Sequence, residues 1–266
     1  MSTFIIGECA ATHDGDLSKA FRLIDLCADI GADAAKFQYL SSAERLVARR
    51  RAPEYLNAYK LLELPPSWLG LLAQKCATRG IELLSSVYLA EDVGLVAPHV
   101  SRLKLASFEF GDEMLLDVCL AFKKPVVISL GMAAKFGMSM RYLPDGSALL
   151  HCVSSYPTPD EEINLRRVSA LRDEFDTRLH IGLSDHTRHP QTGAYAVCAG
   201  AEVVEFHLRL DETSPKNADY EVAKTPEEAR QYIENIRLAE KMLGSGARAV
   251  QPSEEKMLRY RVGGEA

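Results

Sequence analysis

Hydrophobic residues follow two alternating patterns along the whole chain. Short apolar runs rich in β-branched residues are typical of strands buried in a parallel sheet. Between these runs, apolar residues recur three or four positions apart, which predicts amphipathic helices. The short runs predict strands over residues 3–9, 34–38, 82–86, 102–107, 125–130, 148–153, 179–186 and 201–207.

The helical stretches alternate with these strands, and Asp16 and Thr225 stand where side chains that cap helix starts are expected. Residues 132–146 hold two glycines and a proline, so the fifth helix is expected to be irregular or shortened. Eight alternating units predict an α/β fold, a (β/α)8 TIM barrel over residues 1–250, with a short polar tail over 251–266. The expected helices cover 17–30, 66–78, 90–96, 111–122, 165–174, 190–200 and 226–243.

A long polar segment between the second strand and the helix at 66–78 is predicted to be a loop. It contains the basic run Arg49 to Arg51. We interpret this run as a solvated loop surface, and the alternative is that it steers anions towards the barrel mouth.

Charge and cysteine content narrow the class of protein. The 266 residues include 31 basic and 37 acidic side chains, and the net charge of −6 argues against a nucleic-acid partner. The six cysteines form no Cys-x-x-Cys pair, so we interpret them as small core residues in a reducing compartment. The first residues contain neither a basic segment nor a long apolar run, and we expect a cytoplasmic protein without a membrane span.

The last two predicted strands each close on a histidine, His186 and His207. A helix between them makes a β-α-β unit, so the two strands can lie side by side. Both imidazoles would then emerge at the same end and could share one divalent metal ion. The alternative is that each histidine is a hydrogen-bonded structural residue.

Polar residues gather at the predicted strand ends, where the active sites of such barrels lie. Lys36 and Lys104 stand inside apolar strands, where a buried lysine needs an anionic partner. An internal pair with Glu8 or Glu109 is one alternative. The other is a small anion that carries phosphate or carboxylate groups. The strand-end residues are Glu8, Lys36, Gln38, Ser85, Ser86, Lys104, Ser107, Glu109, Ser129, Ser154, Tyr156, Ser184, His186, Glu205 and His207.

Motifs along nearly the whole chain resemble the barrel of the sialic acid synthase (NeuB-like) family. The resemblance implies a TIM barrel that condenses phosphoenolpyruvate with an N-acetylmannosamine-type aldose to a nonulosonic acid and phosphate. The motifs cover residues 6–8, 13–15, 35–38, 61–65, 103–107, 129–132, 150–157, 182–186, 205–207 and 252–255.

The same resemblance implies roles for individual residues. His186 and His207 would hold Mn²⁺ or Mg²⁺, and Glu109 would lie near the reacting carbons. Catalytic roles are implied for Glu8, Lys36, Lys104 and Glu109. Contacts to phosphoenolpyruvate are implied for Lys36, Lys104, Ser86, Ser107, Ser129 and Ser184, and contacts to the sugar for Glu8, Gln38, Tyr156 and Asp219. Ser154 stands where the family has an asparagine and is expected to contact substrate.

Other departures from the family concern the sugar site. Leu130 replaces a threonine and Val87 a proline, and the chain stops where the family continues into an antifreeze-like domain. In the family that domain supplies an arginine to the partner subunit's sugar site. We expect a homodimer, with a separate antifreeze-like-domain protein as a possible partner. The alternatives are a Schiff-base aldolase that uses Lys36 or Lys104, and a non-catalytic binding protein that acts with a partner chain.

Overall fold

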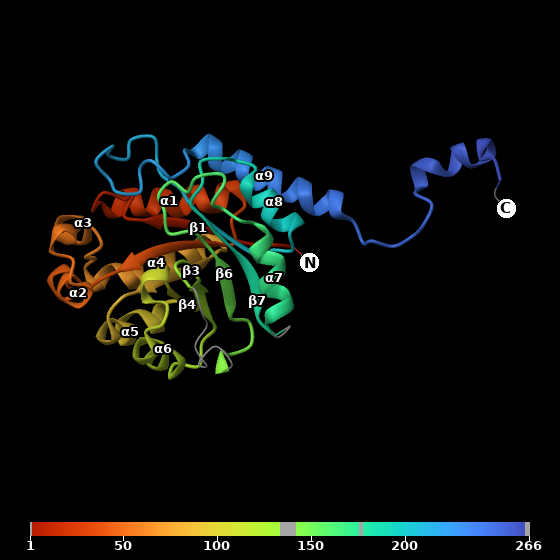
Figure 1. The fold of residues 1–266 in the computed structure, drawn as a ribbon. Helices are drawn as coiled ribbons and strands as arrows, with labels where there is room; N and C mark the ends of the chain where they lie inside the picture. The colour runs from red at the N-terminus through yellow and green to blue at the C-terminus, as the bar shows by residue number, and fades with distance from the viewer. Residues whose placement is uncertain (1, 134–141, 176–177, 264–266) are drawn as a thin grey trace.

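Eight parallel strands close into a barrel in chain order (Figure 1). The computed structural model describes residues 2–133, 142–175 and 178–263. The first strand pairs with the last, so the sheet has no free edge. The predicted α/β barrel is therefore confirmed. The strands are β1 Phe4–Ala10, β2 Ala34–Tyr39, β3 Glu82–Val87, β4 Arg102–Leu105, β5 Val126–Ser129, β6 Ala148–His151, β7 His180–Asp185 and β8 Val203–His207.

Helices follow the strands and cover the outside of the barrel (Figure 1). Asp16 caps the first of them, since its Oδ1 accepts hydrogen bonds from the backbone N–H of Ser18 and Lys19. Thr225 and Glu228 form a capping box at the start of the last. The helices are α1 Leu17–Ile30, α2 Ala43–Arg50, α3 Leu56–Lys60, α4 Pro66–Arg79, α5 Ala90–Val96, α6 Glu113–Leu120, α7 Arg166–Glu174, α8 Thr192–Cys198 and α9 Pro226–Leu243.

Two local predictions are wrong. The segment around the basic run is not a loop, because α2 and α3 occupy it. Ser42 caps α2, but only Ala43 and Leu46 in that helix are buried, so its apolar pattern is weak. The fourth strand ends at Leu105, and Ser107–Glu109 forms a 3-10 turn. The expected irregular fifth helix falls largely on residues 134–141, outside the described residues.

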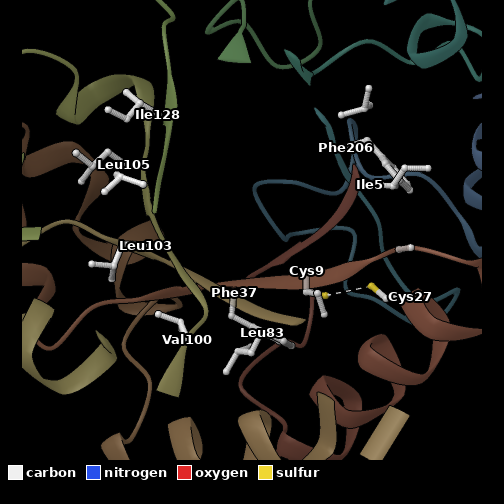
Figure 2. Packing of buried hydrophobic residues seen from close by; sticks show 14 of the residues in the cluster. Ile5, Cys9, Cys27, Phe37, Leu83, Val100, Leu103, Leu105, Ile128 and Phe206 are labelled. Atoms are coloured by element: carbon white, nitrogen blue, oxygen red, sulfur yellow. Dashed lines mark hydrogen bonds between the residues drawn. The ribbon is translucent and has the colours of Figure 1, made fainter. Parts of the chain in front are cut away.

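Most of the hydrophobic core lies between the barrel and the helices. Ile5 on β1 and Phe206 on β8 belong to it, as do Leu103 and Leu105 on β4 (Figure 2). Five cysteines are buried, as the sequence predicts, but Cys198 is exposed. Its position on the outer face of α8 is therefore not a core position.

A second, smaller core fills the inside of the barrel. It consists of Ile6, Ala34, Leu84, Val127, Ala148, Leu150 and Val203. Because side chains alternate across a strand, the residue two positions further along points into the same interior. Ile6 is thus followed by Glu8, Ala34 by Lys36, and Val203 by Glu205. The seven residues of this inner core therefore form an apolar floor, and the inward-facing residues two positions further along the strands form a polar layer above it.

One close approach fixes the spacing of β7 and β8. A Cβ atom on Gly182 would lie 2.0 Å from the carbonyl oxygen of Val203, which leaves room only for glycine. Beyond α9 the chain runs away from the barrel to a 3-10 helix at Pro252–Tyr260, and its described residues are exposed (Figure 1). Among the described residues, no helix is both long enough and apolar enough to cross a membrane.

Candidate active site at the mouth of the barrel

A small cavity lies at the carboxyl ends of the strands, directly above the apolar floor. All but three of the predicted site residues line it. Its volume is ≈ 40 Å³, so it has room for little more than a water molecule or two. Most of an organic ligand would therefore have to lie above it, between the loops. The lining residues are Glu8, Lys36, Gln38, Ser86, Lys104, Ala106, Ser107, Phe108, Ser129, Tyr156, Ser184, His186, Glu205 and His207.

A larger cavity, of ≈ 480 Å³, lies at the opposite end of the strands. Its charged residues already neutralise one another: Glu202 contacts both Arg172 and His180. In barrels of this kind chemistry is performed at the carboxyl end of the strands. The smaller cavity is therefore the candidate active site.

Strand register brings the polar residues together. Glu8 lies beside Lys36 on β2 and beside His207 on β8. Ser86 on β3 lies beside Lys104 on β4, and Ser184 lies beside Glu205. The register therefore brings polar side chains of β1, β2, β3, β4, β7 and β8 together at the carboxyl end of the barrel.

Lys36 is held by carboxylates. Its ammonium group forms an ion pair with Glu8, lies 3.7 Å from Glu205 Oε2, and donates a hydrogen bond of 3.1 Å to Ser86 Oγ. Burial alone would lower the pKa of Lys36, but the two carboxylates outweigh burial and raise it. Of the internal pairs considered from the sequence, Lys36 with Glu8 is present.

The pKa of Glu8 is also raised, but here burial is the cause. Burial raises its pKa from 4.5 to about 7, although Lys36 opposes the shift. Gln38 Nε2 donates a hydrogen bond of 2.9 Å to Glu8 Oε1, and Oε2 faces Lys36. A carboxyl group with this pKa can take up or release a proton near neutral pH.

Lys104 has different partners. Its Nζ donates to the Leu105 carbonyl oxygen at 2.9 Å and to Ser129 Oγ at 2.6 Å. Burial lowers the pKa of Lys104, and Lys36 lowers it further. Among the described residues, no carboxylate lies within ion-pair distance of Lys104. The internal pair of Lys104 with Glu109, one of the alternatives considered from the sequence, is therefore not present, since Glu109 pairs with Arg50.

The two histidines lie together, as the β-α-β interpretation predicts. Their ring centroids are 5.4 Å apart. His186 Nδ1 is 2.8 Å from the Val153 carbonyl oxygen, which fixes Nδ1 as the protonated nitrogen and leaves Nε2 with its lone pair. Burial lowers the pKa of both imidazoles, and for His207 the neighbouring His186 adds to the effect. Both are therefore neutral at pH 7.

Neutral imidazole is the form that binds a metal ion. His207 Nδ1 is buried without a hydrogen-bond partner among the described residues, which fits a ligand position. The described part of the chain contains no group of three or more histidine, cysteine, aspartate or glutamate residues that could hold a metal. Two imidazoles therefore fit a divalent ion only if substrate and water complete its coordination.

Three predicted residues lie outside the cavity lining. Asp219 is beside the site, with Oδ1 3.7 Å from His207 Nδ1, and burial raises the pKa of Asp219 to about 6. Ser154 Oγ is buried without a partner among the described residues. Glu109 follows the lining residue Phe108 in the chain, and its carboxyl group forms an ion pair with Arg50.

The sequence interpretation missed several residues at the mouth. Glu205 was noted at a strand end, but no role was given to it, although it contacts Lys36 and accepts a hydrogen bond from Ser184 at 3.1 Å. Phe108 and Ala106 line the cavity, but they carry no polar signal that a strand-end search detects. Arg50 comes from the segment that was interpreted as a solvated loop.

Known proteins are similar to this chain in sequence and in fold. The model of the NeuB family matches residues 23–248. The N,N'-diacetyllegionaminic acid synthase of Legionella pneumophila is 34% identical over 283 residues, which cover 97% of this chain and 77% of the relative. The pseudaminic acid synthase of Campylobacter jejuni is 30% identical over 277 residues, covering 97% and 79%. An N-acetylneuraminic acid synthetase structure from Leptospira borgpetersenii superposes with a TM-score of 0.85 at 30% identity, covering 98% and 92%.

Proposed function

Because the chain belongs to the NeuB family, we propose that it joins phosphoenolpyruvate to the aldehyde carbon of an aldose. The products would be a nonulosonic acid, or a related 3-deoxy-2-keto sugar acid, and phosphate. The similarity to synthases of N,N'-diacetyllegionaminic, pseudaminic and N-acetylneuraminic acid supports a substrate of the N-acetylmannosamine type. The single observation that carries the proposal is Lys104, a buried ammonium group among hydroxyls that has no carboxylate partner among the described residues.

An anion would satisfy Lys104. Ser129 Oγ already contacts its ammonium group, and Ser107 and Ser184 line the same cavity. Phosphate and carboxylate oxygens accept hydrogen bonds from ammonium and hydroxyl groups, and charge-assisted bonds of this kind are strong. Phosphoenolpyruvate carries both groups, and we assign the Lys104 side of the cavity to it.

The reaction forms one carbon–carbon bond and one carbon–oxygen bond, the latter from water, and breaks the carbon–oxygen bond to phosphate. The enol carbon attacks the aldehyde carbon, and the aldehyde oxygen takes up a proton. Water then adds to the carbon that bears the phosphate, and phosphate leaves with the bridging oxygen as a keto group forms. Glu8 is suited to supply the first proton, since its pKa of about 7 allows it to be protonated before the step and ionised afterwards.

We propose that His186 and His207 hold Mn²⁺ or Mg²⁺. Such an ion, when bound, would polarise the aldehyde oxygen as a Lewis acid. The protein's own contribution is to keep both imidazoles neutral by burial and to fix the His186 ring through the Val153 carbonyl oxygen. Tyr156, whose ring centroid lies 4.1 Å from that of His186, closes this side of the cavity.

A Schiff-base aldolase remains the second candidate, because burial lowers the pKa of Lys104 and so favours the neutral, nucleophilic amine. Borohydride trapping distinguishes the two reactions. An aldolase of this class is trapped by borohydride in the presence of pyruvate, whereas the proposed synthase is not.

Phosphate release from phosphoenolpyruvate with Mn²⁺, measured across a panel of aldoses, tests the proposal. We expect release that depends on both an aldose and the metal. His186→Ala and His207→Ala should lose bound metal in elemental analysis and lose the activity with it. Metal-independent activity, full metal content in both variants, or borohydride trapping with pyruvate would contradict the proposal.

A further inference from the structure

Two arginines at the end of α2 tie three loops of the barrel mouth together. Arg49 Nη1 donates a hydrogen bond of 2.9 Å to the carbonyl oxygen of Tyr88, after β3. Arg49 also forms an ion pair with Asp112, and Arg50 forms one with Glu109, both after β4. The interpretation of the basic run as a solvated surface therefore fails for Arg50, whereas Arg49 and Arg51 are exposed. Arg49 and Arg50 link the loop after β2 to the next two loops.

Arg50 is enclosed by aromatic rings. Its guanidinium carbon lies 4.8 Å from the ring centre of Phe108, 5.2 Å from that of Tyr59 and 5.3 Å from that of Tyr88. Nη1 also donates to the Tyr59 hydroxyl at 2.9 Å. Each such cation–π contact is favourable, more so when the cation is shielded from water. The Arg50 side chain is only 15% exposed, so its position is well defined.

The enclosed guanidinium contacts two consecutive residues with different surroundings. Phe108 lines the cavity and is 57% exposed. Glu109 is buried: its Oε1 is bound by Arg50, and its Oε2 has no hydrogen-bond partner among the described residues. An unsatisfied buried carboxylate oxygen is unfavourable unless a donor reaches it. A sugar hydroxyl is such a donor.

We propose that Arg50 is a positioning residue, which fixes Phe108 and Glu109 at the mouth so that they receive the polyhydroxylated substrate above the anion. The inference rests on the proposed function and adds a residue from α2 to the sugar side of the site.

Arg50 also affects the charge of Glu109. Burial raises the pKa of Glu109, and Arg50 opposes the shift. The other groups that face this carboxyl are Arg49 from α2, Lys104 from β4 and Tyr88 after β3. Without Arg50, Glu109 would therefore stay protonated to a higher pH and would accept hydrogen bonds less well.

Steady-state kinetics on Arg50→Met, Arg50→Lys and Arg45→Met tests the proposal. Arg45 is the matched control, since it lies on the same helix in an exposed pair with Glu91. We expect Arg50→Met to raise the KM for the aldose roughly tenfold or more, with the KM for phosphoenolpyruvate within about twofold of wild type. Arg50→Lys should recover part of the loss. Equal aldose KM values in Arg50→Met and Arg45→Met would overturn the proposal.

A second measurement separates this inference from the proposed function. If the wild-type chain releases no phosphate with any aldose, the proposed function fails, and the positioning role is tested by NMR. In protein labelled with ¹³C-glutamate, the Glu109 carboxyl signal is assigned through Glu109→Gln. Its pKa should rise by about one unit or more in Arg50→Met but not in Arg45→Met. An unmoved pKa would overturn the proposal. If Arg50→Met does not fold, Arg50→Lys should show a smaller rise in the pKa of Glu109.

Discussion

Lys36 and Lys104 occupy equivalent places in the barrel and have opposite surroundings. Both point inward from the middle of a strand, and both are almost fully buried. Lys36 lies between β1 and β3 and is paired with Glu8 and Glu205. Lys104 lies between β3 and β5 and contacts a hydroxyl and a carbonyl oxygen.

The difference shows that the neighbouring strands, and not the position of the lysine, decide its role. Two carboxylates raise the pKa of Lys36 against the effect of burial, whereas the pKa of Lys104 is lowered by burial. One lysine is therefore neutralised within the protein and contributes to its stability. The other has only a carbonyl oxygen and a hydroxyl as partners, and under the proposed function the bound substrate neutralises it. Three substitutions test this contrast.

The largest effect is expected for Lys36→Met. Removing one member of a buried ion pair leaves the other charge uncompensated, which typically lowers the free energy of unfolding by about 3–5 kcal/mol. Denaturant unfolding at pH 8, where Glu8 is ionised in the wild-type chain, measures the loss. Lys104→Met is the comparison, and it should lose less stability because, among the described residues, no carboxylate lies within ion-pair distance of Lys104, although Glu205 and Glu109 feel its charge. Equal losses of unfolding free energy in the two variants would contradict the proposed difference between Lys36 and Lys104.

Lys104→Met should instead weaken the binding of phosphoenolpyruvate. Deleting a buried charged donor that a ligand requires costs about 2–5 kcal/mol, so we expect the dissociation constant to rise roughly 30-fold or more. The increase in melting temperature with added phosphoenolpyruvate measures the binding. An unchanged shift in Lys104→Met would move the anion elsewhere in the molecule.

A smaller effect is expected from Glu8→Gln, in the pH dependence of stability. The pKa of Glu8 is raised from 4.5 to about 7 in the folded state. Its contribution to stability is therefore fully present below pH 4.5 and is lost as the pH rises through about 7. Between pH 5 and 8 the wild-type chain should lose about 2–3 kcal/mol relative to Glu8→Gln. Parallel stability curves for the two proteins would show that Glu8 has an ordinary pKa.

Periodicity alone predicted the barrel and most of the cavity lining. Residues two apart on a strand face the same side, so a polar residue after an apolar run marks the mouth of the barrel, as Lys36 and His207 do. Periodicity does not predict which side chain each of these polar residues contacts. Whether Lys104 pairs with Glu109 depends on where β4 ends and on Arg50, which is 59 residues distant from Glu109 in the sequence.

Helix α2 was missed for a related reason. Its only buried residues are Ala43 and Leu46, and it is held in place by ion pairs to distant loops. A periodicity search detects apolar faces, so it does not detect a helix that is anchored by charge. The roles given to the site residues by resemblance, including the metal ligands, remain predictions until binding is measured.

The apolar floor beneath the polar layer bears on the order in which two ligands can bind and leave. The floor seals the barrel axis, so the site is a well with a single opening. Two ligands that bind one above the other in such a well cannot exchange independently. The deeper one has to arrive first, and it can depart only after the upper one has left. Under the proposed function, the seven apolar side chains on the inside of the sheet would therefore set the order in which the two substrates bind and leave.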